Sequence, residues 1–253
     1  MGKISVVINT YNADKHLQHV LDSVRDFDEV LICDMESTDG TIRIAEQNNC
    51  RVVVFPNKGY LSAEPARTFA IQSASNPWIL VVDADELITP ELRRFLYEYI
   101  EMDNCAQGLY IPRINQFMGK TLKCAYPDYQ LRFFIREGTE WPPYVHTFPH
   151  VNGRLEKLPK QKKELAMIHL ADDPIHVIME KDNRYSDDDV YKKANKHYGV
   201  VALMCRPFWR FFKCFILDGG WRDGVCGLIY AGLKGIYQFE LVAKHIERNY
   251  AKR

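Results

Sequence analysis

The stretch Trp78-Ile79-Leu80-Val81-Val82-Asp83-Ala84-Asp85-Glu86 decides the fold. Its five consecutive apolar residues predict a strand that is buried on both faces. Three carboxylates follow within four residues, at the carboxyl end of the strand, where open α/β sheets bind their ligands. Because carboxylates this close repel one another, we expect a cation beside them, and oxygen ligands favour Mg²⁺ or Mn²⁺.

The alternative is a surface turn whose acids cap the next helix. That helix has a cap of its own, since Thr89 stands at the N-cap, Pro90 at the first helical position and Glu91 in the first turn. Asp83 and Asp85 are therefore not needed as caps, which favours the functional interpretation. Both can face one ion only if the strand bends as it ends.

The 253 residues favour one large domain or one domain with an appendage, and an apolar fraction of 47% permits a substantial core. The formal net charge of +0 gives no signature of nucleic-acid binding. The charge is uneven, however, because residues 192–253 carry 12 Lys and Arg against 4 Asp and Glu. The seven cysteines are scattered and form no C-x-x-C pair, which favours a reducing compartment over a disulfide framework.

The first residues, Met1-Gly2-Lys3, run directly into a predicted strand, so no signal peptide is expected. No run of about 18 uncharged apolar residues occurs, so the sequence does not predict a spanning helix.

Four predicted strands alternate with helices in the first part of the chain, which indicates a parallel, doubly wound sheet. The helix after the first strand has Leu17, Val20, Leu21 and Val24 at helical spacing. The predicted strands are 4–8, 29–33, 51–55 and 78–82, and a further helix is expected at about 63–74.

Phosphate-binding glycine motifs are missing from this chain. No G-x-G-x-x-G follows the first strand, and there is no G-x-x-x-x-G-K-[ST] loop. Phosphates must then be held in another way, for which a metal on Asp83 and Asp85 together with Arg67 would serve.

Four ordered motifs resemble those of family 2 glycosyltransferases, which have the A-type nucleotide-sugar fold. The resemblance spans roughly residues 3–185 and is strongest to small bacterial enzymes that add a β-linked sugar to lipopolysaccharide core or surface polysaccharide. The motifs are Thr10-Tyr11-Asn12, Asp34 with Ser37-Thr38-Asp39-Gly40-Thr41, Asn57-Lys58-Gly59 with Ala66-Arg67, and Asp83-Ala84-Asp85-Glu86.

The resemblance implies roles for these positions in binding the nucleotide sugar. The candidate residues for the nucleotide are Thr10, Tyr11, Asn12, Asp34, Ser37, Asp39, Arg67 and Asp83. The D-x-D pair, Asp83 and Asp85, would hold the ribose and the metal. Two positions depart from the family pattern: Met35 replaces the usual second acid, and Thr68 replaces an asparagine.

Residues 91–185 resemble the acceptor-binding half of the family, after a nucleotide-sugar half at 1–90. The aromatic side chains of Trp141 and Tyr144 would suit stacking on sugar faces, or they merely cover a loop. An inverting transfer needs a base for the acceptor hydroxyl. Asp128 is the first candidate and His146 the second.

Glu86 is a third and weaker candidate base. His169 follows the apolar run 165–168 and is a candidate third metal ligand, because A-type enzymes often supply a late histidine. A single histidine at a strand end is as often a satisfied core group. The acids at 187–189 are expected to cap a helix that begins at Val190.

The tail, residues 186–253, is predicted to be a helical appendage. Residues 207–217 mix aromatic side chains with Arg and Lys, which is typical of a helix in a membrane interface, and 225–243 form a second apolar helix. Its net charge of +8 from residue 192 onward would favour anionic lipid. The alternative is a hairpin packed on the core or in a dimer, and no oligomeric state is predicted.

The sequence therefore predicts an inverting, metal-dependent glycosyltransferase with a mostly parallel, Rossmann-like sheet at 1–185. It would move a sugar from a nucleotide-sugar donor, most simply UDP-linked, to a saccharide or lipid-linked acceptor. Its predicted place is cytoplasmic and peripheral, on the inner face of the bacterial inner membrane. The alternatives are a sugar-phosphate nucleotidyltransferase, whose glycine-rich loop is missing here, and a non-catalytic membrane-bound scaffold.

Overall fold

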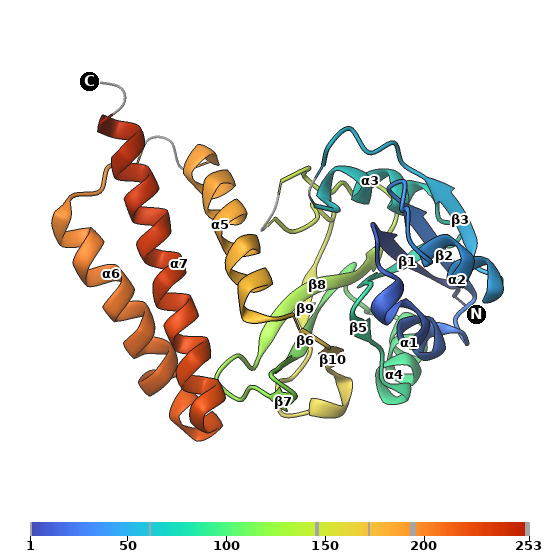
Figure 1. Cartoon of the computed structure of the whole chain (residues 1–253). Helices are drawn as coiled ribbons and strands as arrows, with labels where there is room; N and C mark the ends of the chain where they lie inside the picture. The colour runs from blue at the N-terminus through green and yellow to red at the C-terminus, as the bar shows by residue number, and fades with distance from the viewer. Residues whose placement is uncertain (1, 61, 145–146, 172, 193–195, 251–253) are drawn as a thin grey trace. The chain divides into compact units, whose positions relative to one another are not determined.

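The structure is a computed structural model that describes residues 2–60, 62–144, 147–171, 173–192 and 196–250 (Figure 1). The chain divides into two compact units. The first comprises Met1–Ile114 and Pro127–Leu170, and the second comprises Asn115–Tyr126 and Ala171–Arg253.

The sheet has ten strands, and its main path runs in the order β3-β2-β1-β4-β8-β6-β10-β5. The strands of the first half, β3, β2, β1 and β4, are parallel to their neighbours, as their alternation with helices predicts. Strand β8 joins β4 in the antiparallel direction, so the second half makes the sheet mixed. The strands are β1 (Ile4–Thr10), β2 (Glu29–Asp34), β3 (Arg51–Val54), β4 (Trp78–Asp83), β5 (Glu86–Leu87), β6 (Gly108–Phe117), β7 (Lys120–Thr121), β8 (Asp128–Ile135), β9 (Leu155–Lys157) and β10 (Met167–His169).

The helices of the first unit cover both faces of this sheet. They are α1 (Asp14–Val24), α2 (Thr41–Gln47), α3 (Glu64–Ser73), α4 (Pro90–Ile100) and the 3₁₀ turn η1 (Lys163–Leu165). Helix α4 begins at the expected cap, because the Thr89 hydroxyl accepts a hydrogen bond from the Leu92 amide at 3.1 Å. The sheet order and the helices on both faces confirm the predicted α/β fold.

Side chains of successive strand residues alternate between two cores, which explains how one apolar strand serves both faces. On β1, Val6 and Ile8 pack with the residues of α1 and α4, whereas Val7 packs with those of α3. On β4, Leu80 and Val82 join the first core. The run 78–82 is therefore buried on both sides, which leaves its carboxyl end as the place for polar groups.

The second unit is mainly helical. Its elements are α5 (Ile175–Lys192), α6 (Val200–Phe212), the π-helix η2 (Lys213–Leu217), the 3₁₀ turn η3 (Gly220–Asp223) and α7 (Gly224–Tyr250). A core of Phe117, Leu122, Cys226 and Leu233 holds its segments together. Among the described helices, none combines the length and apolar character needed to cross a bilayer.

Two details of the second unit concern its acids and one of its glycines. The prediction that the acids at 187–189 cap a helix beginning at Val190 is wrong, because they lie inside α5. Their charge is accommodated there by α7, whose Lys244 forms a 2.7 Å ion pair with Asp187. Glycine is required at position 227, where a Cβ would lie 2.0 Å from the carbonyl oxygen of Gly220.

Candidate active site

The three acids that end β4 point to different partners. Asp83 is the last residue of β4, Asp85 lies in the turn, and Glu86 begins β5. The backbone amide of Asp83 donates to Glu86 Oε2 at 3.0 Å, so the chain turns back on itself within four residues. The turn therefore separates the side chains of Asp83 and Asp85, which would otherwise repel each other.

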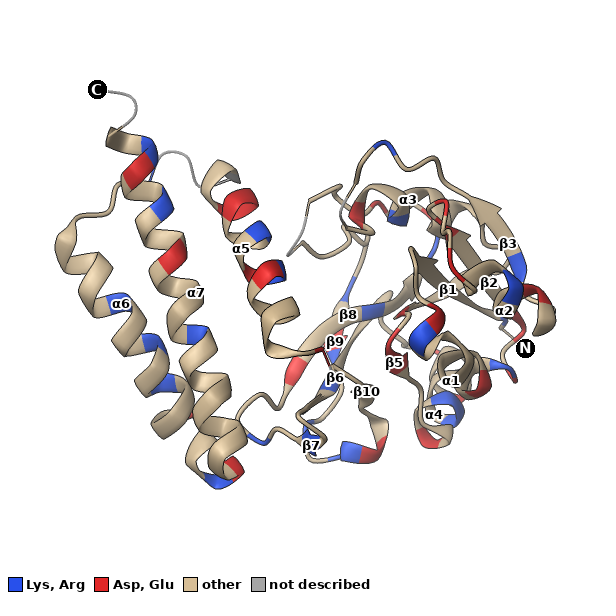
Figure 2. Ribbon diagram, in the orientation of Figure 1, with Lys and Arg blue, Asp and Glu red and all other residues tan. Residues whose placement is uncertain are grey.

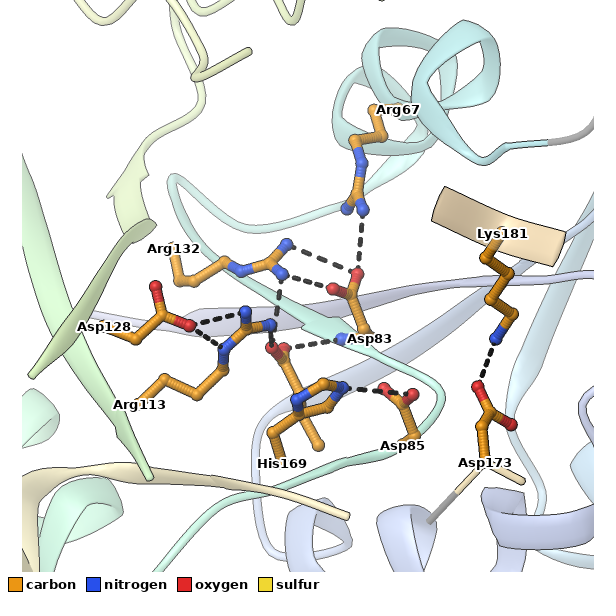
Figure 3. A network of polar contacts seen from close by, with 10 residues as sticks. Arg67, Asp83, Asp85, Arg113, Asp128, Arg132, His169, Asp173 and Lys181 are labelled. Atoms are coloured by element: carbon orange, nitrogen blue, oxygen red, sulfur yellow. Dashed lines mark hydrogen bonds and ion pairs between the residues drawn. The ribbon is translucent and has the colours of Figure 1, made fainter. Parts of the chain in front are cut away.

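Asp83 is clamped by two arginines, which Figure 3 shows converging on its carboxylate. Arg67 of α3 donates from Nη2 to Oδ1 at 2.8 Å. Arg132 of β8 donates from Nη1 to Oδ1 at 3.3 Å and from Nη2 to Oδ2. Burial would raise the pKa of Asp83, but the guanidinium groups of Arg132 and Arg67 outweigh it and hold that pKa well below its ordinary range.

Arg132 also connects Asp83 to a second group of charged residues, Glu86, Arg113 and Asp128. Glu86 is fully buried, and its Oε1 accepts from Arg113 at 2.8 Å and from Arg132 at 3.3 Å. Arg113 of β6 also donates to Asp128 Oδ2, from Nη2 at 2.6 Å and from Nε at 2.9 Å. Burial lowers the pKa of Arg113, but Glu86 and Asp128 more than compensate and raise it, so the guanidinium stays charged. The arginine–carboxylate cluster formed by Arg67, Arg113, Arg132, Asp83, Glu86 and Asp128 thus balances three positive against three negative charges.

Trp141 lies beside this cluster and is buried. Its ring centroid is 4.5 Å from the Cζ atom of Arg67 and 5.9 Å from that of Arg132. Thr68 holds the tryptophan backbone, donating to its carbonyl at 3.0 Å and accepting from its amide at 2.9 Å. Trp141 therefore covers the arginines, whereas Tyr144 is exposed.

Asp85 and His169 face each other outside the clamp. The imidazole Nε2 lies 3.4 Å from Asp85 Oδ2, and both side chains are partly exposed. The antiparallel pairing of β10 with β5 brings them together, and the Leu170 amide fixes the Asp85 carbonyl at 2.9 Å.

This pair is the candidate for a divalent cation. Within the described residues, no three His, Cys, Asp or Glu side chains come together as a complete metal cage. One carboxylate and one imidazole fit an ion that completes its coordination with ligand and water oxygens. An imidazole suits Mn²⁺ better than Mg²⁺, which prefers oxygen ligands throughout. Asp83, the other predicted metal ligand, has both carboxylate oxygens bound to arginines in this structure.

The residues predicted to contact the nucleoside meet at the carboxyl ends of β1 and β2. Thr10 Oγ1 donates to Asp34 Oδ1 at 2.8 Å, and Ser37 donates to the same carboxylate from its amide at 2.8 Å and its hydroxyl at 2.6 Å. Asn12 adopts a positive φ of 49° and accepts from the Thr38 amide at 2.8 Å. These bonds fix the two loops relative to each other, while half of Tyr11 remains exposed.

Asp39 has a different local role. It accepts from the Thr41 amide at 2.9 Å and from the Asp14 amide at 3.1 Å, so it bonds the first turns of both α1 and α2. Burial raises the pKa of Asp39, but the hydrogen bonds from Thr41 and Asp14 outweigh it and lower that pKa. Its described contacts are those of a cap.

Several buried donors near Asp83 have no partner among the described residues. They are Nε and Nη1 of Arg67, Nε of Arg132, Nε1 of Trp141 and the side-chain amide of Asn9. Buried donors without acceptors are costly, so a site rich in them has capacity for an oxygen-rich ligand.

The predicted bases Asp128 and Glu86 differ in exposure. Asp128 is the first residue of β8, bonded to Arg113 through Oδ2, and its Oδ1 accepts from Gln130 at 2.8 Å. It is partly exposed, whereas Glu86 is fully buried. His146 lies outside the described residues.

Arg113 and Arg132 were not among the predicted site residues. Each lies within a strand, where a charged residue in an alternating pattern is usually on the solvent side. The pairing of Leu80 with Phe133 places the neighbouring Arg132 beside the end of β4. The available signal was the excess of acids at 83–86, which requires more cations than Arg67 supplies.

Comparison with known proteins agrees with this geometry. Residues 5–154 match the model of glycosyl transferase family 2. An uncharacterized glycosyltransferase of Rickettsia felis is 42% identical over 96% of this chain and 89% of its own length. The lipopolysaccharide core biosynthesis glycosyltransferase LpsC of Rhizobium meliloti is 25% identical over 98% of this chain and 94% of its own.

Among solved structures, a crystal structure of residues 1–349 of S. aureus TarS is similar in fold. It covers 99% of this chain and 92% of its own, with a TM-score of 0.50 and 17% sequence identity. The family match and the extended similarity to the Rickettsia relative establish that the chain belongs to glycosyl transferase family 2 and is a glycosyltransferase.

Proposed function

We propose that this glycosyltransferase is an inverting, metal-dependent enzyme that uses a nucleotide-sugar donor, with UDP as the nucleotide. The proposal depends on one observation: the two acids of the D-x-D motif have different partners. Asp83 is bound by Arg67 and Arg132, which leaves Asp85 beside His169, 3.4 Å away. The arginines neutralise the charge of Asp83, while Asp85 and His169 remain as possible metal ligands. This arrangement suits a diphosphate that binds together with a divalent cation.

The nucleotide would lie over the carboxyl ends of β1, β2 and β4. The nucleoside would contact a set of residues that are hydrogen-bonded to one another, namely Thr10, Asn12, Asp34 and Ser37. The exposed side chain of Tyr11 would contact it as well. Asp83 would be held by its arginines in place for the ribose. Nε and Nη1 of Arg67 are buried without a described partner while Nη2 remains on Asp83, and phosphate oxygens would supply the acceptors that they lack.

Asp85 and His169 would hold Mn²⁺ or Mg²⁺. A bound ion of this kind supplies positive charge to the departing diphosphate. Arg67 would add its positive charge to that of the ion. Trp141, whose ring lies against the Arg67 guanidinium, would keep water away from it.

Asp128 is the proposed base for the acceptor hydroxyl, with His146 as the second candidate. In this structure Asp128 accepts two hydrogen bonds from Arg113. Arg113 also bonds Glu86, so its positive charge is shared between two carboxylates. If Asp128 is the base, Asp128→Asn lowers kcat by at least about 100-fold and leaves donor KM nearly unchanged.

The proposed acceptor is a saccharide or a lipid-linked saccharide of the cell envelope, as in lipopolysaccharide synthesis. Support comes from the similarity to LpsC, whose name assigns that protein to lipopolysaccharide core biosynthesis. Residues 1–185 would catalyse the transfer, with the donor bound by 1–90 and the acceptor by 91–185. Residues 186–253 would hold the enzyme at the inner face of the bacterial inner membrane.

The test is Asp85→Asn, measured by donor hydrolysis and by transfer from UDP-sugars with Mn²⁺ present. We expect activity to fall by about 100-fold or more, because the cation loses its carboxylate ligand. Asp26→Asn is the matched control, since Asp26 is exposed and pairs only with surface arginines in the described contacts. Unchanged activity of Asp85→Asn would reject the metal role. Release of pyrophosphate from a nucleoside triphosphate would instead identify a nucleotidyltransferase.

A thermal-shift measurement separates binding from turnover. UDP with Mn²⁺ should raise the melting temperature of the wild-type protein more than either alone, because ligands that bind the native state stabilise it. His169→Ala should remove most of the additional shift due to Mn²⁺. An undiminished shift in this variant would exclude His169 as a ligand.

A further inference from the structure

An unusual density of exposed apolar side chains lies on α6 and the turns that follow it. No residue of α6 is buried. Six of its large apolar side chains are between 45% and 76% exposed. They are Val200, Val201, Met204, Phe208, Trp209 and Phe212, and the exposed set continues through Ile216, Leu217, Trp221, Val225 and Leu228. We call these eleven residues the apolar face.

Six residues of the apolar face lie on the amphipathic helix α6, and the other five lie on η2, η3 and the start of α7. Met204, Phe208 and Phe212 are spaced four residues apart and therefore lie along one line of α6. An adjacent side of α6 packs on α7, where a Cβ at Gly235 would lie 3.3 Å from the Pro207 carbonyl oxygen and 3.6 Å from the Phe211 Cβ. A helix whose inner side is already packed has no reason within this unit to carry aromatic residues on its outer side.

Positive charge accompanies this face. Figure 2 shows only basic charge on α6, contributed by Arg206 and Arg210, which lie one turn apart. Of the nearby acids, Asp218 is paired with Lys213 at 2.9 Å, and Asp223 accepts a hydrogen bond from the Cys124 amide at 3.0 Å. The acids are thus engaged within the unit, and the net charge next to the apolar face is positive.

We infer that the apolar face docks on the surface of an anionic lipid bilayer. Phe208, Trp209 and Phe212 would enter the headgroup and upper acyl region, to a depth of about 5–10 Å. Arg206 and Arg210 would bind lipid phosphates, and the indoles of Trp209 and Trp221 would lie at the interface. Charge of one sign beside an aromatic stripe favours lipid over a second copy of the chain, whose identical surface would bring like charges together. This inference rests on the proposed function for its biological place, but lipid binding can be measured without any turnover.

The first experiment is co-sedimentation with vesicles of phosphatidylcholine, with and without phosphatidylglycerol. The wild-type protein should bind the anionic vesicles and bind neutral ones much less. Phe208→Ser combined with Trp209→Ser should reduce the partition coefficient by more than about tenfold. Arg206→Gln combined with Arg210→Gln should reduce it by about tenfold, and only on anionic vesicles.

Val54→Ser is the matched control, because it removes an equally exposed apolar side chain from β3. It should bind vesicles as the wild type does. All altered side chains are exposed, so circular dichroism and melting temperature should remain those of the wild type.

The second experiment locates the contact. Brominated acyl chains in the vesicles should quench the fluorescence of Trp209 and Trp221, and the variant Trp209→Phe/Trp221→Phe should lose that quenching while it still sediments. Trp141 is buried and Trp78 is half-buried, so they provide an internal signal that quenching should leave unchanged.

Two outcomes would overturn the inference. One is equal partition of the wild type and the serine variant. The other is a dimer in light scattering that the serine variant converts to monomer, without vesicle binding by either. Loss of vesicle binding with intact transfer to a soluble acceptor would leave the proposed reaction standing, whereas intact binding with no donor hydrolysis would reject the reaction alone.

Discussion

Two regions of this protein combine arginine with tryptophan and use the combination in opposite ways. In the first unit, Arg67 lies over Trp141, and both are buried. On α6, Arg206 and Arg210 lie beside Trp209, and all three are exposed. The difference is the presence of carboxylates, because the first group has Asp83 as an acceptor and α6 has no acid.

The comparison teaches what permits an arginine to be buried. Taking a guanidinium out of water costs several kcal/mol unless carboxylates and hydrogen bonds replace the water. The arginine–carboxylate cluster meets that condition with equal numbers of both charges, so it can be covered by Trp141. The α6 arginines have no carboxylate partner among the described contacts, and Arg206 donates only to the Gln238 side-chain oxygen at 3.2 Å. They remain at the surface, where an external phosphate can take the role of the carboxylate.

The largest effect is expected from Arg132→Met. This change removes the Arg132 ion pairs with Asp83 and Glu86. We expect a loss of about 3–5 kcal/mol in the free energy of unfolding. Urea denaturation measures this. The same replacement at Arg206 should cost less than about 0.5 kcal/mol, since its side chain is exposed. Equal losses at both positions would contradict the distinction between the two regions.

Asp83→Asn tests the cluster through pH. At neutral pH we expect a loss of about 2–3 kcal/mol, because two buried arginines lose a charged acceptor. The pKa of Asp83 is lowered in the folded state, so its stabilisation is present above the ordinary aspartate value and is lost as pH falls. Stability of the wild type should therefore decline below about pH 4, more steeply than that of Asp83→Asn. Parallel pH profiles would show that the ion pairs contribute nothing.

The smallest effect is expected from the tryptophans. Trp141→Leu removes the cover of Arg67 and should cost about 2 kcal/mol by thermal or urea unfolding. Trp209→Leu should lie within about 0.5 kcal/mol of the wild type, because its ring contributes little to the folded chain. A large loss at Trp209 would mean that α6 needs this ring for folding, and it would weaken the case for a lipid contact.

The sequence predicted the framework of the first unit well. The run 78–82 and its acids gave the position of β4, and the alternation of strands and helices gave the parallel half of the sheet. These features depend on local periodicity, which a single sequence contains. The cap at Thr89 was predicted for the same reason.

The partners of the acids depend on long-range pairing and could not be predicted in the same way. Arg132 reaches Asp83 only because β8 pairs with β4, across 49 residues of chain. The acids at 187–189 looked like a cap because Asp favours helix starts, but they lie inside α5, where Lys244 of α7, distant in the sequence, pairs with Asp187. Local preference fails where a distant residue supplies the compensating charge.

The equal numbers of cations and anions in the arginine–carboxylate cluster have a consequence for evolution. A change at Asp83 alone leaves an excess positive charge, and a change at Arg132 alone leaves an excess negative one. Related sequences that lose one member should therefore carry a compensating change at the other, so positions 83 and 132 should covary although they lie on different strands. Position 85, whose carboxylate lies outside the cluster, should show no such charge coupling to either arginine.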